Sequence, residues 1–338
     1  MDIKILDCTL RDGSHVNKGE FGKEGIKGII QSLTEAGLDF IELGFLKNGV
    51  FTADQSFATT PDKMAEYLPE TSNSKFSMMI RPDWYDIEQL KNKNPRIDLL
   101  RFAFYLKDKE LTRRQCQIVK NFGYQVALNP VNVISYTEKE LLELIRFANE
   151  IQPYTMTIVD TFGSLTFKKL KEVYILIEEN LDKTIAIGLH LHDNMLLAYA
   201  LMQYFLSICS QERKVIIDGS LDGMGRIPGN LTIEMLADFM NTEYGKNYDI
   251  RPLLYAISRW IYPIKKEIPW GYSPVYYLTG KMRIHRSYGE YFLEREELNM
   301  KDIEELLSWI KDSGKKYAFD SKYAESLIRQ QKAMREIK

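Results

Sequence analysis

The sequence predicts a (β/α)₈ TIM barrel over residues 1–250, followed by a mostly helical C-terminal extension over residues 251–338. Two observations support the barrel. Eight short apolar segments alternate with segments of helical periodicity, in the number and order that such a barrel requires. Polar side chains also follow segment after segment at the C-terminal end, where barrels of this class place their active sites.

The expected strands are short runs rich in apolar and β-branched residues. They are Ile3–Leu6, Phe40–Phe45, Phe76–Arg81, Leu99–Tyr105, Gln125–Asn129, Thr155–Asp160, Ile185–His192 and Val215–Ser220. Between them, apolar residues recur at helical spacing. The helices predicted in this way include Lys23–Gly37, Glu138–Ile151, Phe167–Asn180 and Leu196–Cys209. In the aromatic-rich extension, which we expect to cover the barrel mouth or to form an oligomer interface, helices are predicted at Lys301–Lys311 and Tyr323–Lys332.

Bulk composition excludes several classes of protein. A net charge of −2 and a pI near 6.2 argue against a nucleic-acid-binding surface as the main function. No apolar run is long enough to span a membrane, and the N-terminus has no signal pattern. The three scattered cysteines, Cys8, Cys116 and Cys209, have no zinc-site spacing and indicate a reduced, cytoplasmic protein.

The segment after the first strand, Asp7–His15, has the sequence Asp-Cys-Thr-Leu-Arg-Asp-Gly-Ser-His. It places two acids, an arginine and a histidine within nine residues, and such groups are costly to bury without partners. Gly13 is expected to allow a sharp turn. A carboxylate beside a guanidinium can form a site for a cation and an anion. A strand end followed by a salt-bridged loop is an equal alternative on this segment alone.

The seventh expected strand ends in a pattern that points to metal binding. His190, His192 and Asn194 alternate with Leu189 and Leu191, so the two histidines and the asparagine share one face. Two imidazoles at positions i and i+2 can bind one metal ion. The alternative is a pair of hydrogen-bonded core histidines.

A glycine-rich loop follows the eighth expected strand. Residues 219–229 contain four glycines, which indicates a backbone that approaches a ligand or turns tightly. The alternative is a flexible connector.

These three motifs, in this order, resemble those of the DRE-TIM metallolyases, the HMG-CoA lyase-like superfamily, over roughly residues 3–290. The continuation through His15 and the pair Asp193–Asn194 are most similar to the 4-hydroxy-2-oxovalerate aldolase branch. The resemblance implies a divalent metal bound by Asp12, His190 and His192. Mixed nitrogen and oxygen ligation favours Mn²⁺, with Mg²⁺, Co²⁺ and Zn²⁺ as competitors.

The resemblance implies a class II pyruvate aldolase, which makes or cleaves a C–C bond between the enolate of pyruvate and an aldehyde. Arg11 would donate to the enolate oxygen, and His15 would exchange a proton with the 4-hydroxyl group of the substrate. Tyr272 would reach over the barrel mouth. Thr161, Asn129 and Arg226 would bind the substrate. Glu42 and Asn194 would not contact it but would support the residues that do.

The sequence departs from this pattern at Arg226-Ile227-Pro228, where small residues are usual. We therefore expect an aldehyde larger than acetaldehyde that is either anionic or sugar-derived. A homodimer is expected. The tail matches poorly beyond Gly289, so the dehydrogenase partner of this branch is not supported. The alternatives are an acyl-CoA-dependent Claisen enzyme of the same superfamily, against which His15 and Asn194 argue, and a catalytically silent ligand-binding barrel.

Overall fold

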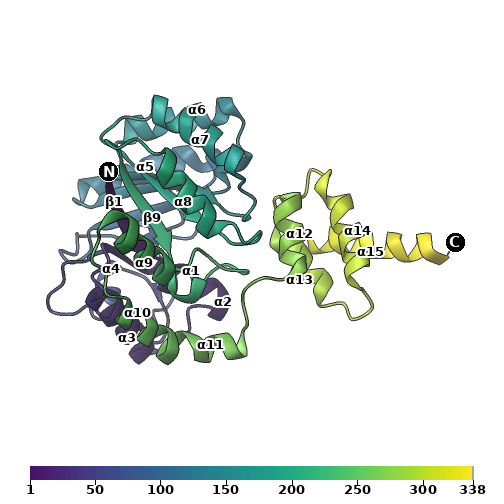
Figure 1. The fold of residues 1–338 in the computed structure, drawn as a ribbon, viewed down its shortest axis with the longest axis horizontal. Coiled ribbons are helices and arrows are strands. Elements are labelled where there is room, and N and C mark those ends of the chain that lie inside the picture. The colour runs from purple at the N-terminus through teal and green to yellow at the C-terminus, as the bar shows by residue number, and fades with distance from the viewer. Residues whose placement is uncertain (337–338) are drawn as a thin grey trace.

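The eight expected strands form a closed parallel barrel in the computed structural model, which describes residues 1–336 (Figure 1). Each strand pairs with the next around the barrel, and β1 pairs with both β9 and β2 to close it. The strands are β1 (Asp2–Asp7), β2 (Phe40–Leu46), β4 (Lys75–Ile80), β5 (Leu99–Phe104), β6 (Gln125–Pro130), β7 (Thr155–Asp160), β8 (Ala186–Leu191) and β9 (Lys214–Gly219). The predicted (β/α)₈ fold is therefore confirmed.

One further strand, β3 (Phe57–Ala58), pairs with the end of β2. This strand was not predicted, because two residues are too few to show the alternation of apolar and polar residues that marks a strand.

The strands are apolar because both faces of a parallel barrel are covered. All seven residues of β2 are buried, for example. One face of the strands packs against the surrounding helices, and the other fills the interior with a small cluster made up of Leu6, Cys8, Phe40, Leu99, Ala127, Ala186 and Ile216. Toward the C-terminal ends of the strands, the residues on the same inward faces are polar, and they form the floor of a pocket at the barrel mouth.

Helices connect most of the strands, as expected. They are α1 (Thr9–Asp12), α2 (Ser14–Asn17), α3 (Lys23–Glu35), α4 (Pro61–Ala65), α5 (Lys109–Asn121), α6 (Glu138–Ile151), α7 (Phe167–Asn180), α8 (Ala198–Ile208) and α9 (Ile233–Tyr244). The predicted ends of the barrel helices agree to within two residues, which is the usual uncertainty of a helix boundary, whereas the predicted helix Tyr323–Lys332 runs from Ser321 to Glu336. The connection from β4 to β5 contains only a 3₁₀ turn, η1 (Ile87–Gln89).

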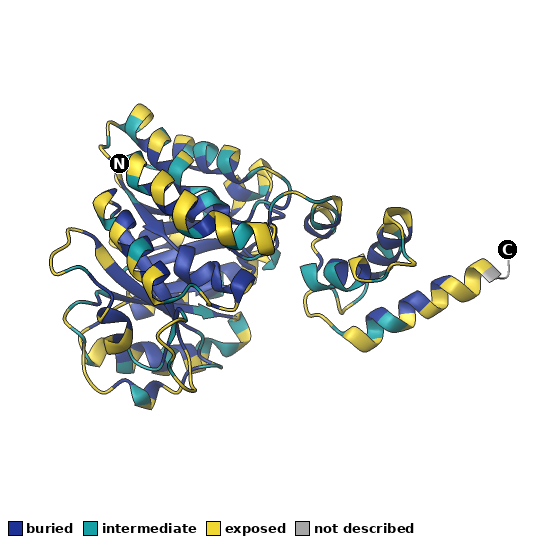
Figure 2. Cartoon of the chain, turned by 90° about the horizontal axis from the view of Figure 1, so that it is seen from below, coloured by how far each residue is buried: buried dark blue, intermediate teal, exposed yellow. Residues whose placement is uncertain are grey.

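The C-terminal extension consists of two parts. α10 (Ile250–Ala256), the π-helical turn η5 (Ile257–Ile261) and α11 (Tyr262–Glu267) contribute residues to the hydrophobic core of the barrel. The last four helices form a separate bundle with its own hydrophobic cluster (Figures 1 and 2). They are α12 (Pro274–Met282), α13 (Arg286–Leu293), α14 (Met300–Lys311) and α15 (Ser321–Glu336). We therefore propose to place the domain boundary between Trp270 and Pro274 rather than after residue 250.

The bundle lies against loops at the C-terminal face of the barrel. Phe162, after β7, stacks on Tyr317 with ring centroids 6.1 Å apart. After β9, the Ile227 carbonyl accepts a hydrogen bond from Arg286 at 3.2 Å. The bundle thus contacts one side of the barrel mouth. Within the described residues, no helix combines the length and hydrophobicity needed to cross a membrane.

Candidate metal and substrate site

A pocket with about 640 Å³ of free space opens at the C-terminal end of the barrel. Its walls come from the ends of most of the strands and from the loops that follow them, as expected for this fold. The side chains around it belong to Arg11, Asp12, His15, Phe45, Met79, Arg81, Trp84, Ala103, Tyr105, Asn129, Val131, Val159, Thr161, His190, His192 and Arg226.

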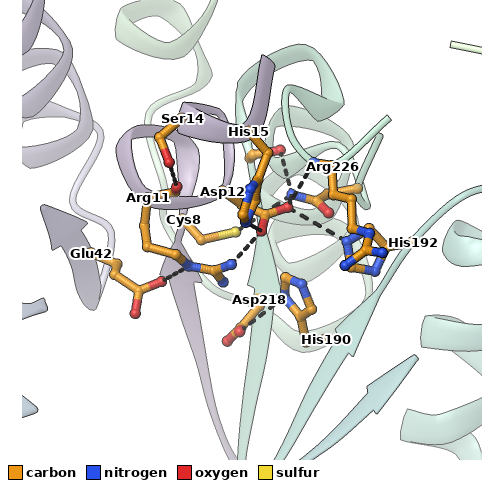
Figure 3. Close-up of polar contacts among 12 residues, drawn as sticks. Cys8, Arg11, Asp12, Ser14, His15, Glu42, His190, His192, Asp218 and Arg226 are labelled. Atoms are coloured by element: carbon orange, nitrogen blue, oxygen red, sulfur yellow. Dashed lines mark hydrogen bonds and ion pairs between the residues drawn. The ribbon is translucent and has the colours of Figure 1, made fainter. Parts of the chain in front are cut away.

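Asp12, His190 and His192 meet at the bottom of this pocket (Figure 3). Asp12 ends the short helix after β1, and the histidines lie on and just after β8, two residues apart on the inward face. One potential ligand atom from each residue lies within 4.8 Å of the others, and all three side chains are buried. Because β8 and β1 both flank β9, the barrel brings together residues that are about 180 positions apart in sequence.

Both histidines direct an unpaired nitrogen into the site. Nδ1 of His192 lies 2.8 Å from the carbonyl oxygen of Asp160, which can only accept, so Nδ1 carries the proton and Nε2 keeps its lone pair. Nδ1 of His190 lies 3.2 Å from Oδ2 of Asp218, close enough for an ion-pair contact but without the geometry of a hydrogen bond. Among the described residues, neither Nε2 atom has a hydrogen-bond partner. Two buried imidazole nitrogens without partners beside a carboxylate fit a divalent cation.

The protonation states suit metal binding. Burial alone would raise the pKa of Asp12, but Arg11 and the two histidines outweigh it and hold this pKa well below its usual range. Burial lowers the pKa of His192, and the hydrogen bond and charge of Asp12 only partly oppose this shift. At neutral pH, Asp12 is therefore a carboxylate and His192 a neutral imidazole, the forms that bind metals.

The glycine-rich loop after β9 approaches Asp12 closely. The Arg226 N–H donates to Oδ2 of Asp12 at 3.0 Å, and Nδ2 of Asn230 donates to the same oxygen at 2.8 Å. A Cβ atom on Gly225 would lie 2.5 Å from this oxygen, so only glycine fits there. The backbone of this loop therefore packs closely against Asp12, and the loop is not a flexible connector.

Buried ion pairs form a chain beside these residues, and Figure 3 shows its two ends, Glu42–Arg11–Asp12 and Asp218–His190. Arg11 pairs with Asp12 and, through Nε, with Glu42 at 2.7 Å. Arg101 joins Glu42, at 3.1 Å, to Asp218, at 2.5 Å, and Asp218 contacts His190. The expected support of Arg11 by Glu42 is present. Arg101 was missed, although a charged residue in the middle of a buried strand was a usable signal.

The segment after β1 differs from the expected turn. Residues 9–17 form the two short helices α1 and α2, and Gly13 has a helical φ of −59°. The expectation of a sharp turn at Gly13 is therefore wrong. Glycine is required there for space instead, because a Cβ atom would lie 3.1 Å from Sδ of Met224 and closer still to the Thr9 carbonyl oxygen.

His15 lies at the entrance to the pocket. Its Nε2 is 3.9 Å from Oδ1 of Asp12, its side chain is one-third exposed at 33%, and its ring packs edge-on against Phe45. Desolvation lowers the pKa of His15 below the usual value of about 6.5, and Arg226 and Arg11 add to this shift while Asp12 opposes it. His15 is therefore neutral near pH 7 and can accept a proton, but its pKa is not the unperturbed one expected from sequence.

Three further predicted residues face the pocket. Oγ1 of Thr161 accepts the Asn132 N–H at 2.7 Å, so its own hydroxyl hydrogen is free to donate. Oδ1 of Asn129 is buried and has no partner among the described residues. Nη2 of Arg226 lies 3.1 Å from Nε2 of His285, in the C-terminal bundle.

Two predicted residues lie outside this pocket. Tyr272 is 57% exposed and is absent from the pocket walls. Its neighbour Trp270 is held by a hydrogen bond from Nε1 to the Asp222 carbonyl. Asn194 is buried, and its Nδ2 donates to the Tyr276 carbonyl at 3.2 Å, so it joins the loop after β8 to α12.

Comparisons with known proteins agree with this architecture. Residues 107–256 match the HMGL-like family model. The chain is 23% identical to 4-hydroxy-2-oxovalerate aldolase of Bacillus cereus over 287 residues, covering 81% of this chain and 82% of that protein. It is 25% identical to 4-hydroxy-2-oxovalerate aldolase 6 of Rhodococcus jostii over 276 residues, covering 79% and 76% of the two chains.

Solved structures share the fold. The N-terminal domain of a putative aldolase from Bacteroides vulgatus superposes with a TM-score of 0.75 at 24% identity, covering 87% of this chain and 97% of that one. HMG-CoA lyase from Brucella melitensis superposes with a TM-score of 0.64 at 14% identity, covering 78% and 99%. The resemblance inferred from the three sequence motifs is confirmed.

We predict that protein purified without chelator contains one divalent metal ion per chain. His190→Ala should lose most of this metal, because two ligands remain, whereas His285→Ala, which removes a histidine outside the set, should keep it. Elemental analysis measures both. Full metal occupancy in His190→Ala would rule out the assignment.

Arg101→Met should destabilise the protein by about 3–5 kcal/mol, because two buried carboxylates lose their shared cation. Arg11→Ala should lower the free energy of unfolding by less, since Glu42 keeps its contact with Arg101. Urea denaturation followed by circular dichroism compares the two variants. Equal stability of Arg101→Met and the parent protein would show that the ion-pair chain contributes nothing to the fold.

Proposed function

We propose that this chain, which carries an HMGL-like domain at residues 107–256, is a divalent-metal-dependent aldolase. It would make or cleave the C–C bond between pyruvate and an aldehyde, with a 4-hydroxy-2-oxo acid as the joined form. The observation that carries the proposal is the buried set of Asp12, His190 and His192, with two unpaired imidazole nitrogens directed into a pocket beside Arg11. The names of the relatives support the same chemistry.

Asp12, His190 and His192 would hold a divalent cation, with Mn²⁺ preferred, and the bound ion would supply Lewis acidity toward the oxygens of a 2-oxo acid. The protein groups around it bind and orient the substrate. The hydroxyl of Thr161 and the amide of Asn129, which both line the pocket, would hold the pyruvyl carboxylate.

Arg11 is placed to stabilise the enolate. Its Nε and Nη1 are engaged by Glu42 and Asp12, so Nη2 remains to donate to a developing oxyanion. The two carboxylates fix the plane of the guanidinium before substrate binds, and a preorganised donor costs no reorganisation during the reaction.

His15 is the proposed base. In the cleavage direction it takes the proton from the 4-hydroxyl group as the C3–C4 bond breaks, the electron pair moves into the enolate, and C3 then takes a proton to give pyruvate. The aldehyde leaves, and no oxidant or reductant is consumed. Its lowered pKa keeps His15 in the neutral, accepting form at pH 7.

Two further expectations from the sequence concern the cellular compartment and the oligomeric state. The three cysteines are free and buried, which suits a reducing compartment such as the cytoplasm. The homodimer stays a prediction.

We predict that the protein exchanges the methyl protons of pyruvate with solvent in the presence of metal, because enolisation is the half-reaction of any aldolase that uses pyruvate as nucleophile. Proton NMR in D₂O follows the decay of the methyl signal. Arg11→Ala should keep the fold and the metal but slow exchange by about 10²–10³-fold. Absence of exchange above a metal-only control would favour the acyl-CoA-dependent alternative.

His15→Ala should slow cleavage of 4-hydroxy-2-oxo acids by about 10²–10⁴-fold, while pyruvate proton exchange is much less affected. The reason is that enolisation of pyruvate does not involve the 4-hydroxyl group. Because His15 is partly exposed, added imidazole should restore part of the cleavage rate. Equal losses in both assays, or no rescue, would assign His15 another task.

A further inference from the structure

A second pocket, here called the annex, adjoins the main pocket. Its walls are formed by Ser14, His15, Lys18, Phe45, Lys47, Gln55, Phe57 and Trp84. His15, Phe45 and Trp84 belong to both pockets, so the two spaces meet across the His15 ring. The annex is built from α2 and the residue after it, the end of β2, β3, and the loops that follow β2 and β4.

The position of the annex assigns it to one part of the substrate, if the proposed function holds. Asp12, His190, His192 and Arg11 fix the pyruvyl end at the bottom of the main pocket. His15 marks C4, the carbon that comes from the aldehyde. The rest of the aldehyde is attached to C4, so it extends past His15 into the annex.

The annex carries two lysines with unmatched charge. Within the described residues, neither Lys18 nor Lys47 has a carboxylate oxygen within 4.0 Å, whereas Arg81, which lines the adjoining main pocket, is paired with Asp83 at 2.6 Å. Nζ of Lys47 lies 5.1 Å from the Phe57 ring centroid and 6.0 Å from that of Trp84. Its ammonium group is therefore placed over the aromatic walls and not in a salt bridge.

Local structure does not explain the choice of Lys18. This residue ends α2 in the left-handed conformation, with φ of 57°. Glycine or asparagine is preferred at such a position, and a lysine there carries a conformational cost.

We propose that the aldehyde substrate carries an anionic group, a phosphate or a carboxylate, some distance from its carbonyl carbon, and that Lys18 and Lys47 bind this group in the annex. Ammonium groups suit such a ligand as flexible point charges. The rings of Phe45, Phe57 and Trp84 contact the intervening carbon chain. This inference rests on the proposed aldolase function and specifies its second substrate.

Matched aldehydes test the proposal in condensation with pyruvate. Glyceraldehyde 3-phosphate is compared with glyceraldehyde, and succinic semialdehyde with pentanal, so that each pair differs mainly in charge. The anionic member of one pair should have the higher kcat/KM, and the pair that shows it distinguishes phosphate from carboxylate. The preference should fall as salt is added, because the lysines are exposed.

Charge-removing variants connect the preference to the annex. Lys18→Met and Lys47→Met should each raise KM for the anionic aldehyde by about ten- to a hundredfold, the usual size of a lost hydrogen bond to a charged group. The loss of kcat/KM should be much smaller for the neutral partner, which has no anionic group for the lysines to bind. Lys171→Met removes an exposed lysine on α7 and serves as the matched control.

The outcomes separate this inference from the aldolase proposal. The annex assignment would be overturned, and the aldolase function left standing, by either of two results. In one, the protein exchanges pyruvate protons but shows no preference for anionic aldehydes. In the other, the preference survives in the Lys18→Met/Lys47→Met double variant. Loss of proton exchange in the parent protein would overturn the function itself.

Discussion

The site depends on a chain of buried charges inside the barrel. Arg11 and Arg101 are each shared by two carboxylates, and together they connect Asp12, Glu42 and Asp218. Burying an ion costs several kcal/mol unless partners compensate for it. Two guanidinium groups against three carboxylates leave one negative charge unmatched. A divalent cation beside Asp12, His190 and His192 would neutralise this charge and leave one positive charge, which a bound anionic substrate would balance.

The same chain fixes the geometry of the proposed reaction. Glu42 and Asp12 hold the Arg11 guanidinium from two directions, and Asp218 holds the imidazole of His190 through its contact with Nδ1. Residues that would contact the substrate are thus oriented by groups on other strands, and those strands are rigidly paired around the barrel. A displaced strand would move a metal ligand and an oxyanion donor together, which links the stability of the barrel to the order of the site.

The residues that sequence reasoning placed correctly lie on regular elements. Alternation along β8 puts His190 and His192 on one face, which the strand period was sufficient to predict. Asp12 was added to them from the family resemblance, and closure of the barrel brings it close. Tyr272 could not be placed in this way, because its position depends on how the chain leaves α11 and on the hydrogen bond that holds Trp270. The pKa of His15 was likewise beyond reach, since it depends on desolvation in the folded chain and on the charges of Asp12 and Arg226.

Arg226 links the C-terminal bundle to the site. Its backbone N–H binds Asp12, and its guanidinium lies in the pocket beside His285, which precedes α13. Burial, with the charges of Arg226 and Arg286, lowers the pKa of His285 to about 4, so the ring is neutral at pH 7. A neutral imidazole accepts at only one nitrogen, yet Arg226 approaches Nε2 at 3.1 Å and the Ser287 N–H approaches Nδ1 at 3.3 Å. The Arg226 guanidinium and the Ser287 N–H therefore compete for the single lone pair of the His285 ring. The position of the Arg226 guanidinium in the pocket is thus coupled to the first turn of α13 in the bundle.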